Sequence, residues 1–436
     1  MSSTDMGRPV APSVGRSQQD ADGRGDYDVV VVGGGAGGVG AAVGAAQSGA
    51  KVLLVEKYPF LGGAATISSV LSLCGIFDQR GEKVVAGVTD QLLDRLREHG
   101  AYREKTMGWT GNRIVLLDAE TTKLAYDEVT AAAGVDVRLH STLIGAERLG
   151  DRVTALELHH RGGRETVRAA AFVDGSGDGA LLAEAGAEFR VEPVERRQTS
   201  SLVCRFGGVA EDADLSREGT RTAVAEYATS GGVQLPRDYG IMVRLPITGE
   251  IMAILVDEQV DALDAAALSR DEAGGRRQSR QYLEALRKHL PGWSGAHLIE
   301  TGPQMGIRET RHLVGRASLT AEDVLTSRKQ PDESIARCGW PVEDHAGRGV
   351  TRYAPLAEQS WYDVPYGAIC SSDTDNLWAV GRLTSAQADA YASVRVMGTA
   401  LATGHAAGVA AAQYASGRPH DLPAIRAELR GQGAIV

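Results

Sequence analysis

The chain has 436 residues, of which 43% are hydrophobic and 23% charged; this is an ordinary globular composition, and the length suggests two or three domains. The net charge of −10 argues against a nucleic-acid partner, because no basic face would compensate phosphate charge. The four cysteines lie far apart without a C-x-x-C pair, which argues against a metal site or a redox disulfide and suits a reducing cytosol. We therefore expect a cytoplasmic protein with small-molecule partners.

Two N-terminal stretches bear on localisation. Residues 1–26 are rich in Ser, Asp, Gly and Arg and have no apolar core, so they predict a disordered tail rather than a signal peptide. The stretch from Val29 to Ala50 carries no charge, but eight of its positions are glycine and a turn interrupts it. It does not predict a membrane span.

The stretch from Tyr27 to Glu56 has the order of a dinucleotide-binding unit. Its run of four valines predicts a strand that is buried on both faces. Gly33, Gly35 and Gly38 then stand in G-x-G-x-x-G spacing, which turns the chain, lets backbone approach a pyrophosphate and lets the next helix pack on the strand. The free N–H groups of that helix can bind the phosphate. At the end of a second strand, the Glu56 carboxylate can accept hydrogen bonds from a ribose.

Further elements follow along the chain. Helices are expected over residues 82–99, 118–134, 278–289 and 397–412, and strands over 135–146, 152–160, 165–168, 170–173, 200–207, 240–257 and 376–381. Asp118 is the expected N-cap of the second helix, and Gly162-Gly163 is the expected turn of a hairpin. The last helix is almost all Gly and Ala. Because glycine weakens a helix, this composition implies very close packing against a sheet or a ligand.

The middle of the chain differs in composition, with more arginine and more polar loops between about residues 190 and 354. We therefore predict an α/β fold in which a Rossmann-like nucleotide-binding domain is discontinuous, formed by residues 27–189 and 355–420. Residues 190–354 are expected to form an inserted α+β substrate domain with strands of a mixed sheet. Residues 421–436 are expected to be a C-terminal tail.

Five motifs stand in this chain in a specific order. They are VVVVGGGAGGVGAAVGAA with Glu56, FLGGAATIS, FVDGSGDGALLAEAGA, MGIRETRHLVG and NLWAVGRLTSAQADAYASVRVMGTALATGHAAGVAAA. With them the chain resembles the FAD-dependent oxidoreductases related to fumarate reductase and glutathione reductase, over nearly all of its length after the tail. The glycine loop reads DGSGDG where related proteins often have D-A-T-G-D. An H-x-G-x-x-G pattern of covalent flavin attachment is not evident, so we expect FAD to be bound non-covalently.

The resemblance implies an FAD site assembled from several distant parts of the chain. The implied contacts are Gly33, Gly35, Ala36, Gly37 and Gly38 with the pyrophosphate, Glu56 with the ribose, Lys57 and Leu143 with the adenine, Gly62, Gly63 and Ala64 with the ribityl chain and flavin, Gly175 and Asp178 in a loop over the adenosine, Gly381 and Arg382 by the pyrophosphate, and Arg395, Val396 and Met397 at the pyrimidine edge of the flavin. A helix beginning near residue 396 would stabilise the anionic reduced flavin by ~0.3–1 kcal/mol.

Candidates for the catalytic site come from two segments. Arg308 and Arg311 could hold a substrate carboxylate bidentately, although salt bridges between domains are an alternative role for them. His312 could act as a general base, or be a structural histidine. Tyr366 could supply a hydroxyl at the active face. We expect no metal.

The function expected from these features is hydride transfer between a small organic substrate and FAD, by a dehydrogenase or reductase. One alternative is a flavin-dependent monooxygenase, which would need NAD(P)H to reduce the flavin although no separate nicotinamide domain is evident. Another alternative is a non-catalytic flavin-binding subunit of a complex. The expected partners are the substrate and NAD(P)H or another electron donor or acceptor; the sequence leaves open whether the protein forms homo-oligomers and which substrate it takes.

Overall fold

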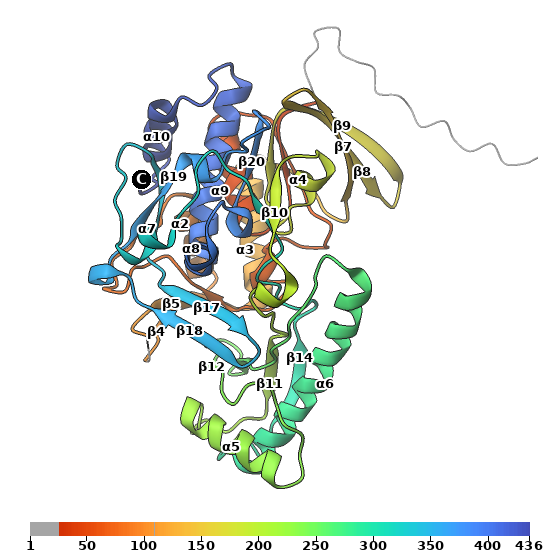
Figure 1. The fold of residues 1–436 in the computed structure, drawn as a ribbon, viewed down its shortest axis with the longest axis vertical. Coiled ribbons are helices and arrows are strands. Elements are labelled where there is room, and N and C mark those ends of the chain that lie inside the picture. Colours follow the sequence, from red (N-terminus) through yellow and green to blue (C-terminus); the bar gives the residue numbers. More distant parts are fainter. Residues whose placement is uncertain (1–25, 109) are drawn as a thin grey trace, which may run out of the picture.

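The computed structural model of the protein describes residues 26–108 and 110–436 (Figure 1). The predicted N-terminal tail, residues 1–26, therefore lies almost entirely outside the described residues. Across the described ranges, no helix is both long enough and apolar enough to cross a membrane.

A parallel β-sheet lies in the upper body of the molecule (Figure 1). Its strands, in spatial order, are β6 (Asp136–Arg138), β2 (Val52–Val55), β1 (Tyr27–Val32), β9 (Gly163–Asp174) and β20 (Leu377–Ala379). Val30 of β1 lies between Leu53 of β2 and Phe172 of β9, and all three side chains are fully buried. The valine run thus forms a central strand of a Rossmann-like sheet, and the expected fold class is confirmed.

Strand β9 is paired in parallel along one half of its length and antiparallel along the other. Its second half pairs in parallel with β1, and its first half pairs antiparallel with β8 (Arg152–His160), which in turn pairs with β7 (Thr142–Leu149). The hairpin predicted near Gly162-Gly163 is therefore present. The two strands predicted over 165–168 and 170–173 are one continuous strand. This strand places the loop after Asp174 at the carboxyl edge of the parallel sheet.

Helices α1 (Ala36–Gln47) and α9 (Met397–Ala415) pack directly against each other although they are far apart in sequence. A Cβ atom built on Gly404 would lie 2.0 Å from the carbonyl oxygen of Gly37, and one on Gly408 would lie 2.0 Å from that of Ala41. Any larger side chain at these positions would force the helices apart. The close packing expected from the Gly/Ala composition of the last helix is confirmed.

The remaining helices of the upper body are α2 (Val88–Glu98), α3 (Ala119–Ala132), α4 (Ala180–Glu184), α7 (Ala321–Leu325), α8 (Ala388–Val394) and α10 (Leu422–Gly431). The carboxylate of Asp118 accepts a hydrogen bond from the Thr121 amide at 2.9 Å, so the predicted N-cap of α3 is confirmed. Residues 421–436, expected as a tail, hold helix α10. It packs on α9 through the fully buried Ile425 and Leu429.

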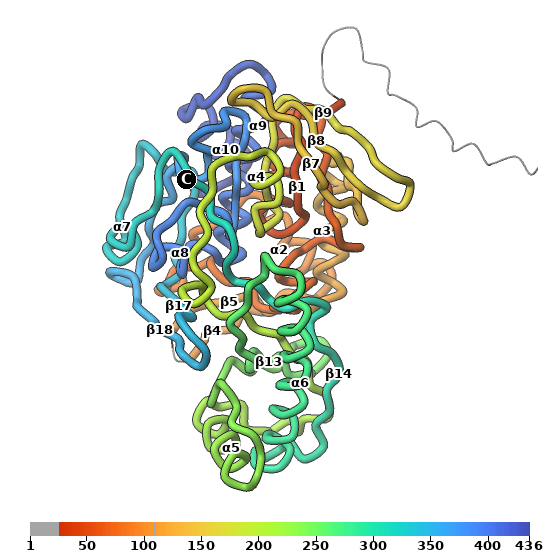
Figure 2. The backbone as a smooth tube through the Cα atoms, turned by 45° about the vertical axis from the view of Figure 1, so that its right-hand side comes forward, coloured from red at the N-terminus to blue at the C-terminus, as the bar shows by residue number. Residues whose placement is uncertain are grey.

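A lower lobe extends from this body (Figures 1 and 2). Its four strands lie in the order β12 (Ile241–Arg244), β13 (Ile251–Ile254), β11 (Cys204–Gly207) and β14 (His297–Thr301), and all their pairings are antiparallel, so the prediction of a mixed sheet was wrong. Helices α5 (Arg217–Thr229) and α6 (Ala265–His289) pack with this sheet around a hydrophobic cluster of their own. Helix α6 ends where predicted, before Pro291, but begins thirteen residues earlier than residue 278.

The remaining strands form small separate sheets. They are β3 (Ser72–Leu73), β4 (Arg103–Thr106) and β5 (Arg113–Leu116), then β10 (Phe189–Val191) with β15 (Arg311–Leu313), β16 (Ser334–Cys338) with β19 (Tyr362–Pro365), and the hairpin of β17 (Val342–Gly347) and β18 (Val350–Ala354). Val342 belongs to the core of the upper body, whereas the Gly349 amide donates to Asp257 of the lower lobe at 2.6 Å. The hairpin therefore bridges the two parts.

Candidate functional site

One large cavity, with a volume of about 670 Å³, runs from the carboxyl edge of the parallel sheet to the lower lobe. Its upper part, which we call the glycine side, is lined by the turns after β1, β2 and β9 and by the beginning of α9. Its other part, which we call the cap side, is lined by β12, β13, the β17–β18 hairpin and the segment before β15. Ligands of open α/β sheets bind at this edge.

The three motif glycines have different neighbours. A Cβ atom on Gly38 would lie 1.7 Å from the Gly33 carbonyl oxygen, and one on Gly33, where φ is +97°, would lie 2.5 Å from Ser176 Cα. A Cβ atom on Gly35 would meet only Gly63 Cα, at an ordinary 3.7 Å. Gly35 is also the N-cap of α1, whose first turn carries no acidic side chain. The structure thus keeps an open cradle at a helix N-terminus, and this cradle fits a pyrophosphate.

Glu56 is buried at the end of β2 and lines the same cavity. Its Oε2 accepts a hydrogen bond from the Gly34 amide at 2.6 Å, and its Oε1 accepts one from the Tyr58 amide at 3.0 Å. These two bonds fix the orientation of the carboxylate between the glycine turn and the segment after β2. Its remaining lone pairs can accept from ribose hydroxyls.

The loop after β9 is held from within by Asp174. This fully buried carboxylate accepts hydrogen bonds from the Ser176 amide at 3.0 Å and the Leu182 amide at 3.0 Å, while burial raises its pKa. Further along the loop, Asp178 pairs with Arg382 at 3.0 Å, and Arg382 also donates to the Ile307 carbonyl at 2.8 Å. This ion pair connects the glycine side to the segment that enters the cap side.

Most residues expected at the FAD site do line the cavity. Those that do are Gly33, Gly35, Ala36, Gly37, Glu56, Lys57, Gly63, Ala64, Leu143, Gly175, Asp178, Gly381, Arg382, Arg395, Val396 and Met397. Gly38 and Gly62 do not line it, because both serve the packing beneath: Gly38 lies against Gly33, and the Gly62 amide donates to the Gly34 carbonyl at 2.8 Å. The contacts of these residues with a cofactor stay a prediction.

Of the four catalytic candidates, the structure brings only Arg308 to the cavity. Arg311 does not line it and donates from Nη1 to the Asp178 carbonyl at 2.8 Å. His312 is 1% exposed, and its ring lies between Glu309, at 2.8 Å from Nε2, and the ring of Tyr391. The hydroxyl of Tyr366 accepts from Trp378 Nε1 at 3.1 Å and contacts His420 Nδ1 at 2.9 Å. Both side chains are thus committed to interior hydrogen bonds away from the cavity, which is a structural correction to their expected placement.

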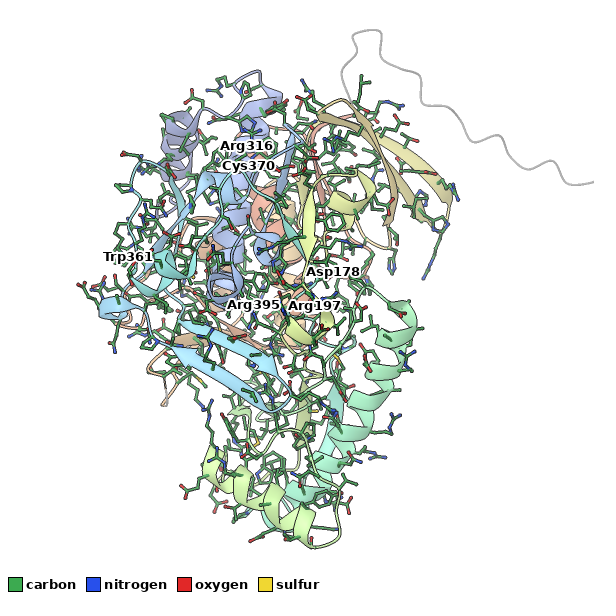
Figure 3. All side chains as sticks on the ribbon, in the orientation of Figure 1. Asp178, Arg197, Arg316, Trp361, Cys370 and Arg395 are labelled. Carbon is green, nitrogen blue, oxygen red and sulfur yellow. The ribbon has the colours of Figure 1, made fainter. Side chains whose placement is uncertain are left out.

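The cap side carries a group of basic residues that the sequence did not single out together. Arg217, Arg237, Arg308, Arg395 and His345 all line the cavity, and we call them the cationic wall. Figure 3 labels Arg395, which lies near the junction of the upper body and the lower lobe. The signal in the sequence was weak, because these residues come from α5, a loop, the segment before β15, the turn between α8 and α9, and β17.

Arg308 is partly buried in the cavity wall. Burial, followed by the positive charges of Arg395 and Arg237, lowers its pKa to about 9, so it is still a cation at neutral pH. Its Nη1 donates to the Thr199 carbonyl at 2.6 Å. Arg395 donates from Nη2 to Gln198 Oε1 at 2.8 Å and to the Glu343 carbonyl at 3.2 Å. Neither guanidinium has a carboxylate at ion-pairing distance among the described residues.

Arg237 and His345 form a connected pair. Arg237 lies 3.0 Å from the carboxylate of Asp257 and donates from Nη2 to His345 Nδ1 at 3.1 Å. Burial and then the charges of Arg308, Arg395 and Arg237 hold the pKa of His345 well below its usual value. Because a guanidinium only donates, Nδ1 must be the acceptor and the ring proton must lie on Nε2.

We call the four-stranded sheet of the lower lobe, β12-β13-β11-β14, the cap sheet. The fold and the glycine side define the class of the protein, a dinucleotide-binding α/β protein with a cap sheet. Residues 28–430 match the family model described as FAD dependent oxidoreductase. The chain therefore belongs to this family and uses FAD, and the resemblance drawn from the five motifs is confirmed. It is an enzyme of the oxidoreductase class.

Named relatives match parts of the chain. It is 37% identical over 109 residues to vinyl phenol reductase of Lactiplantibacillus plantarum, covering 25% of this chain and 22% of that protein. It is 55% identical over 73 residues to fumarate reductase (cytochrome) of Shewanella frigidimarina, covering 17% and 13%. The matches thus span well under half of these curated relatives. The solved structure of a geranylgeranyl bacteriochlorophyll reductase-like protein from Thermoplasma acidophilum matches with a TM-score of 0.50 at 15% identity, covering 94% of this chain and 84% of that one, and supports the fold.

Proposed function

We propose that the protein transfers a hydride between a small organic substrate and non-covalently bound FAD, as a dehydrogenase or reductase. The observation that carries this proposal is that a single cavity joins the glycine cradle to the cationic wall. A cofactor extended along the glycine side would thus end where the cap begins. In this proposal Gly35, Glu56 and Arg382 hold the nucleotide part, and the beginning of α9 meets the flavin.

The beginning of α9 favours a ligand that gains negative charge. No acidic side chain occupies its first turn, and Arg395 stands two residues before its first residue, Met397. Bound FAD supplies the hydride chemistry. The helix end and Arg395 would stabilise the anion that forms on reduction, by ~0.3–1 kcal/mol for the dipole and more where water is excluded.

The cap side can bind a substrate and keep water away from it. Apolar side chains from the cap sheet line it, namely Val203, Ile241, Val243, Met252 and Ile254. His345 of the cationic wall and Glu343, two residues before it on β17, also line the cap side. A neutral histidine carrying its proton on Nε2 can donate a hydrogen bond to a polar group of the substrate.

Anaerobic reduction of the purified FAD-loaded protein tests this proposal. We expect candidate substrates, added alone, to bleach the oxidised flavin spectrum in the dehydrogenase direction, or to reoxidise a chemically reduced flavin in the reductase direction. Bleaching only by NADH or NADPH, followed by rapid reaction with oxygen and hydroxylation of the substrate, would replace the proposal with a monooxygenase. A flavin that no donor bleaches and no substrate reoxidises would favour a non-catalytic subunit.

A further inference from the structure

Within the cationic wall, Arg308 lies close enough to Arg395 and Arg237 for their positive charges to lower its pKa. The carboxylates that act on Arg308 in the opposite direction are Asp257 and Glu343. Asp257 is already engaged, since it pairs with Arg237 at 3.0 Å and accepts from the Gly349 amide at 2.6 Å. Glu343 lines the cavity, but it forms no ion pair with a described residue. Arg308 and Arg395 are only partly buried and line the cavity without a carboxylate at ion-pairing distance among the described residues, so a ligand of opposite charge could reach both.

Arg308 and Arg395 are held in place by neutral acceptors only. Arg308 donates to the carbonyl of Thr199, and Arg395 donates to the amide oxygen of Gln198 and the carbonyl of Glu343. The Nε group of Arg395 is buried with no hydrogen-bond partner among the described residues. Neutral acceptors orient a guanidinium but leave its charge uncompensated. Both groups are therefore oriented and still have N–H groups to donate.

His345 adds a neutral donor to the same wall. Its Nδ1 is occupied by Arg237, at 3.1 Å, and by Thr351 Oγ1, at 3.1 Å. The ring proton is consequently on Nε2, and among the described residues Nε2 has no partner. A neutral N–H beside guanidinium groups can share the second oxygen of a carboxylate, which offers several acceptor positions.

The remainder of the cap side is apolar. Trp340 and Met107 line it together with the aliphatic residues of the cap sheet, and Cys74 is a protonated thiol there because burial raises its pKa to about 12. These surfaces carry no basic side chain, and the basic residues of the cap side are confined to the cationic wall. The lining therefore fits a ligand with one acidic end and an apolar body.

We propose that the substrate is an organic monocarboxylate with an apolar body, whose carboxylate binds Arg308 and His345 of the cationic wall while its body lies against the cap sheet. This inference rests on the proposed function only in that it calls the ligand a substrate. The carboxylate binding that it describes does not require turnover. Arg395 can then stabilise the reduced flavin. The cationic wall thus binds two neighbouring negative charges, the substrate carboxylate and the flavin anion.

The test titrates the oxidised FAD-loaded protein with benzoate, hexanoate and benzamide in a buffer free of other small carboxylates, following the flavin absorption band and the heat of binding. We expect benzoate and hexanoate to bind and the neutral isostere benzamide to bind at least about 10-fold more weakly, because charge-assisted hydrogen bonds are lost. Equal binding of benzoate and benzamide, or no binding of either carboxylate, would overturn the inference.

Arg308→Gln should weaken benzoate binding about 10- to 100-fold while FAD stays bound. The matched control is Arg205→Gln, since Arg205 pairs with Glu250 and Glu300 in the cap sheet and does not line the cavity; its benzoate affinity should not change. Unchanged affinity in Arg308→Gln contradicts the inference even where catalysis is intact. If carboxylates bind but no substrate exchanges a hydride with the flavin, the proposed function fails and this site remains. Should Arg308→Gln not fold, the benzamide comparison on the unmodified protein still decides.

Discussion

The two sides of the cavity are built from different parts of the polypeptide. The glycine side is made mostly of main chain: the cradle at Gly35, the amides of Gly34 and Tyr58 on Glu56, and the beginnings of two helices. The cap side is made of side chains drawn from distant segments. A site made of main chain restricts which residues can stand at many adjacent positions, whereas a site made of side chains restricts only the few positions that reach it.

The strongest test of the glycine side is a substitution in its packing. Gly38→Val would place Cβ 1.7 Å from the carbonyl oxygen of Gly33, so we expect a loss of at least about 3 kcal/mol in the free energy of unfolding, or no folded protein. Chemical denaturation followed by circular dichroism measures this. The control is Gly431→Ala at an open position in helix α10, which should be neutral or slightly stabilising. A Gly38→Val protein of normal stability would show that the helix can move away from the turn.

Gly35→Val should separate cofactor binding from folding. Its Cβ has room in the protein itself, with its nearest neighbour at 3.7 Å, but the side chain would occupy the cradle. We expect a folded protein with most of its FAD lost, measured as the ratio of flavin to protein absorbance after purification. Recovery of a fully FAD-loaded Gly35→Val protein would refute the assignment of the cradle to the pyrophosphate.

Glu56→Gln is expected to have a smaller effect on the same side. The Gly34 and Tyr58 amides donate to different oxygens of Glu56, so glutamine would place its NH₂ group, a donor, against one of these two N–H groups. We expect FAD affinity to fall about 10- to 100-fold, measured by the fluorescence of released FAD. The exposed Glu120→Gln serves as the control, and an identical affinity in the two variants would remove Glu56 from the ribose site.

The smallest expected effect is on the pH dependence of stability. It is compared for two histidines, one on the cap side and one in the packing behind the glycine side. His345 lies in the cationic wall and His405 in α9 against α1, and burial is the first cause that lowers the pKa of each. Below about pH 6.5 the unfolded chain binds these protons and the folded protein does not. The free energy of unfolding should therefore fall as pH drops from about 6.5 towards the lowered pKa of each histidine, by at most about 1.4 kcal/mol per pH unit for each, and depend little on them well above about pH 7.

Urea unfolding at several pH values measures this slope. His405→Gln should remove the contribution of one histidine to this pH dependence of the unfolding free energy and leave carboxylate binding unchanged. His345→Gln should remove a similar share and weaken carboxylate binding as well. A slope that neither variant changes would show that other groups control acid sensitivity.

The parts of the fold that depend on local sequence could be predicted. The buried strands, the hairpin and the Asp118 cap follow from local patterns, and so does the cradle. The first half of α6 was missed because Gly274 and Gly275 interrupt a charged stretch. In the structure a Cβ atom on Gly275 would meet Leu202 and Met305 at 3.1–3.3 Å, so this glycine serves helix packing. That requirement belongs to the tertiary structure and leaves no periodic trace in the sequence.

The cap side shows the limit on predicting the site. Arg308 was found because it stands in a charged motif, whereas Arg237 and His345 stand in unremarkable segments that come together only when the β17–β18 hairpin meets the lower lobe. His312 was expected there because its segment resembles one that lies near the flavin, and Tyr366 because it could supply a hydroxyl, but their partners Glu309 and Trp378 hold them inside the protein. Residue chemistry proposed more candidates than the packing allows to reach the cavity.

The contact between α1 and α9 sets an order of events during synthesis. Helix α1 begins at Ala36 and its partner begins at Met397, so nearly the whole chain must leave the ribosome before the two can pack. Contacts between such distant segments form late. The beginning of α9 also lines the cavity, so the glycine side of the cavity is complete only after this late segment has packed against α1.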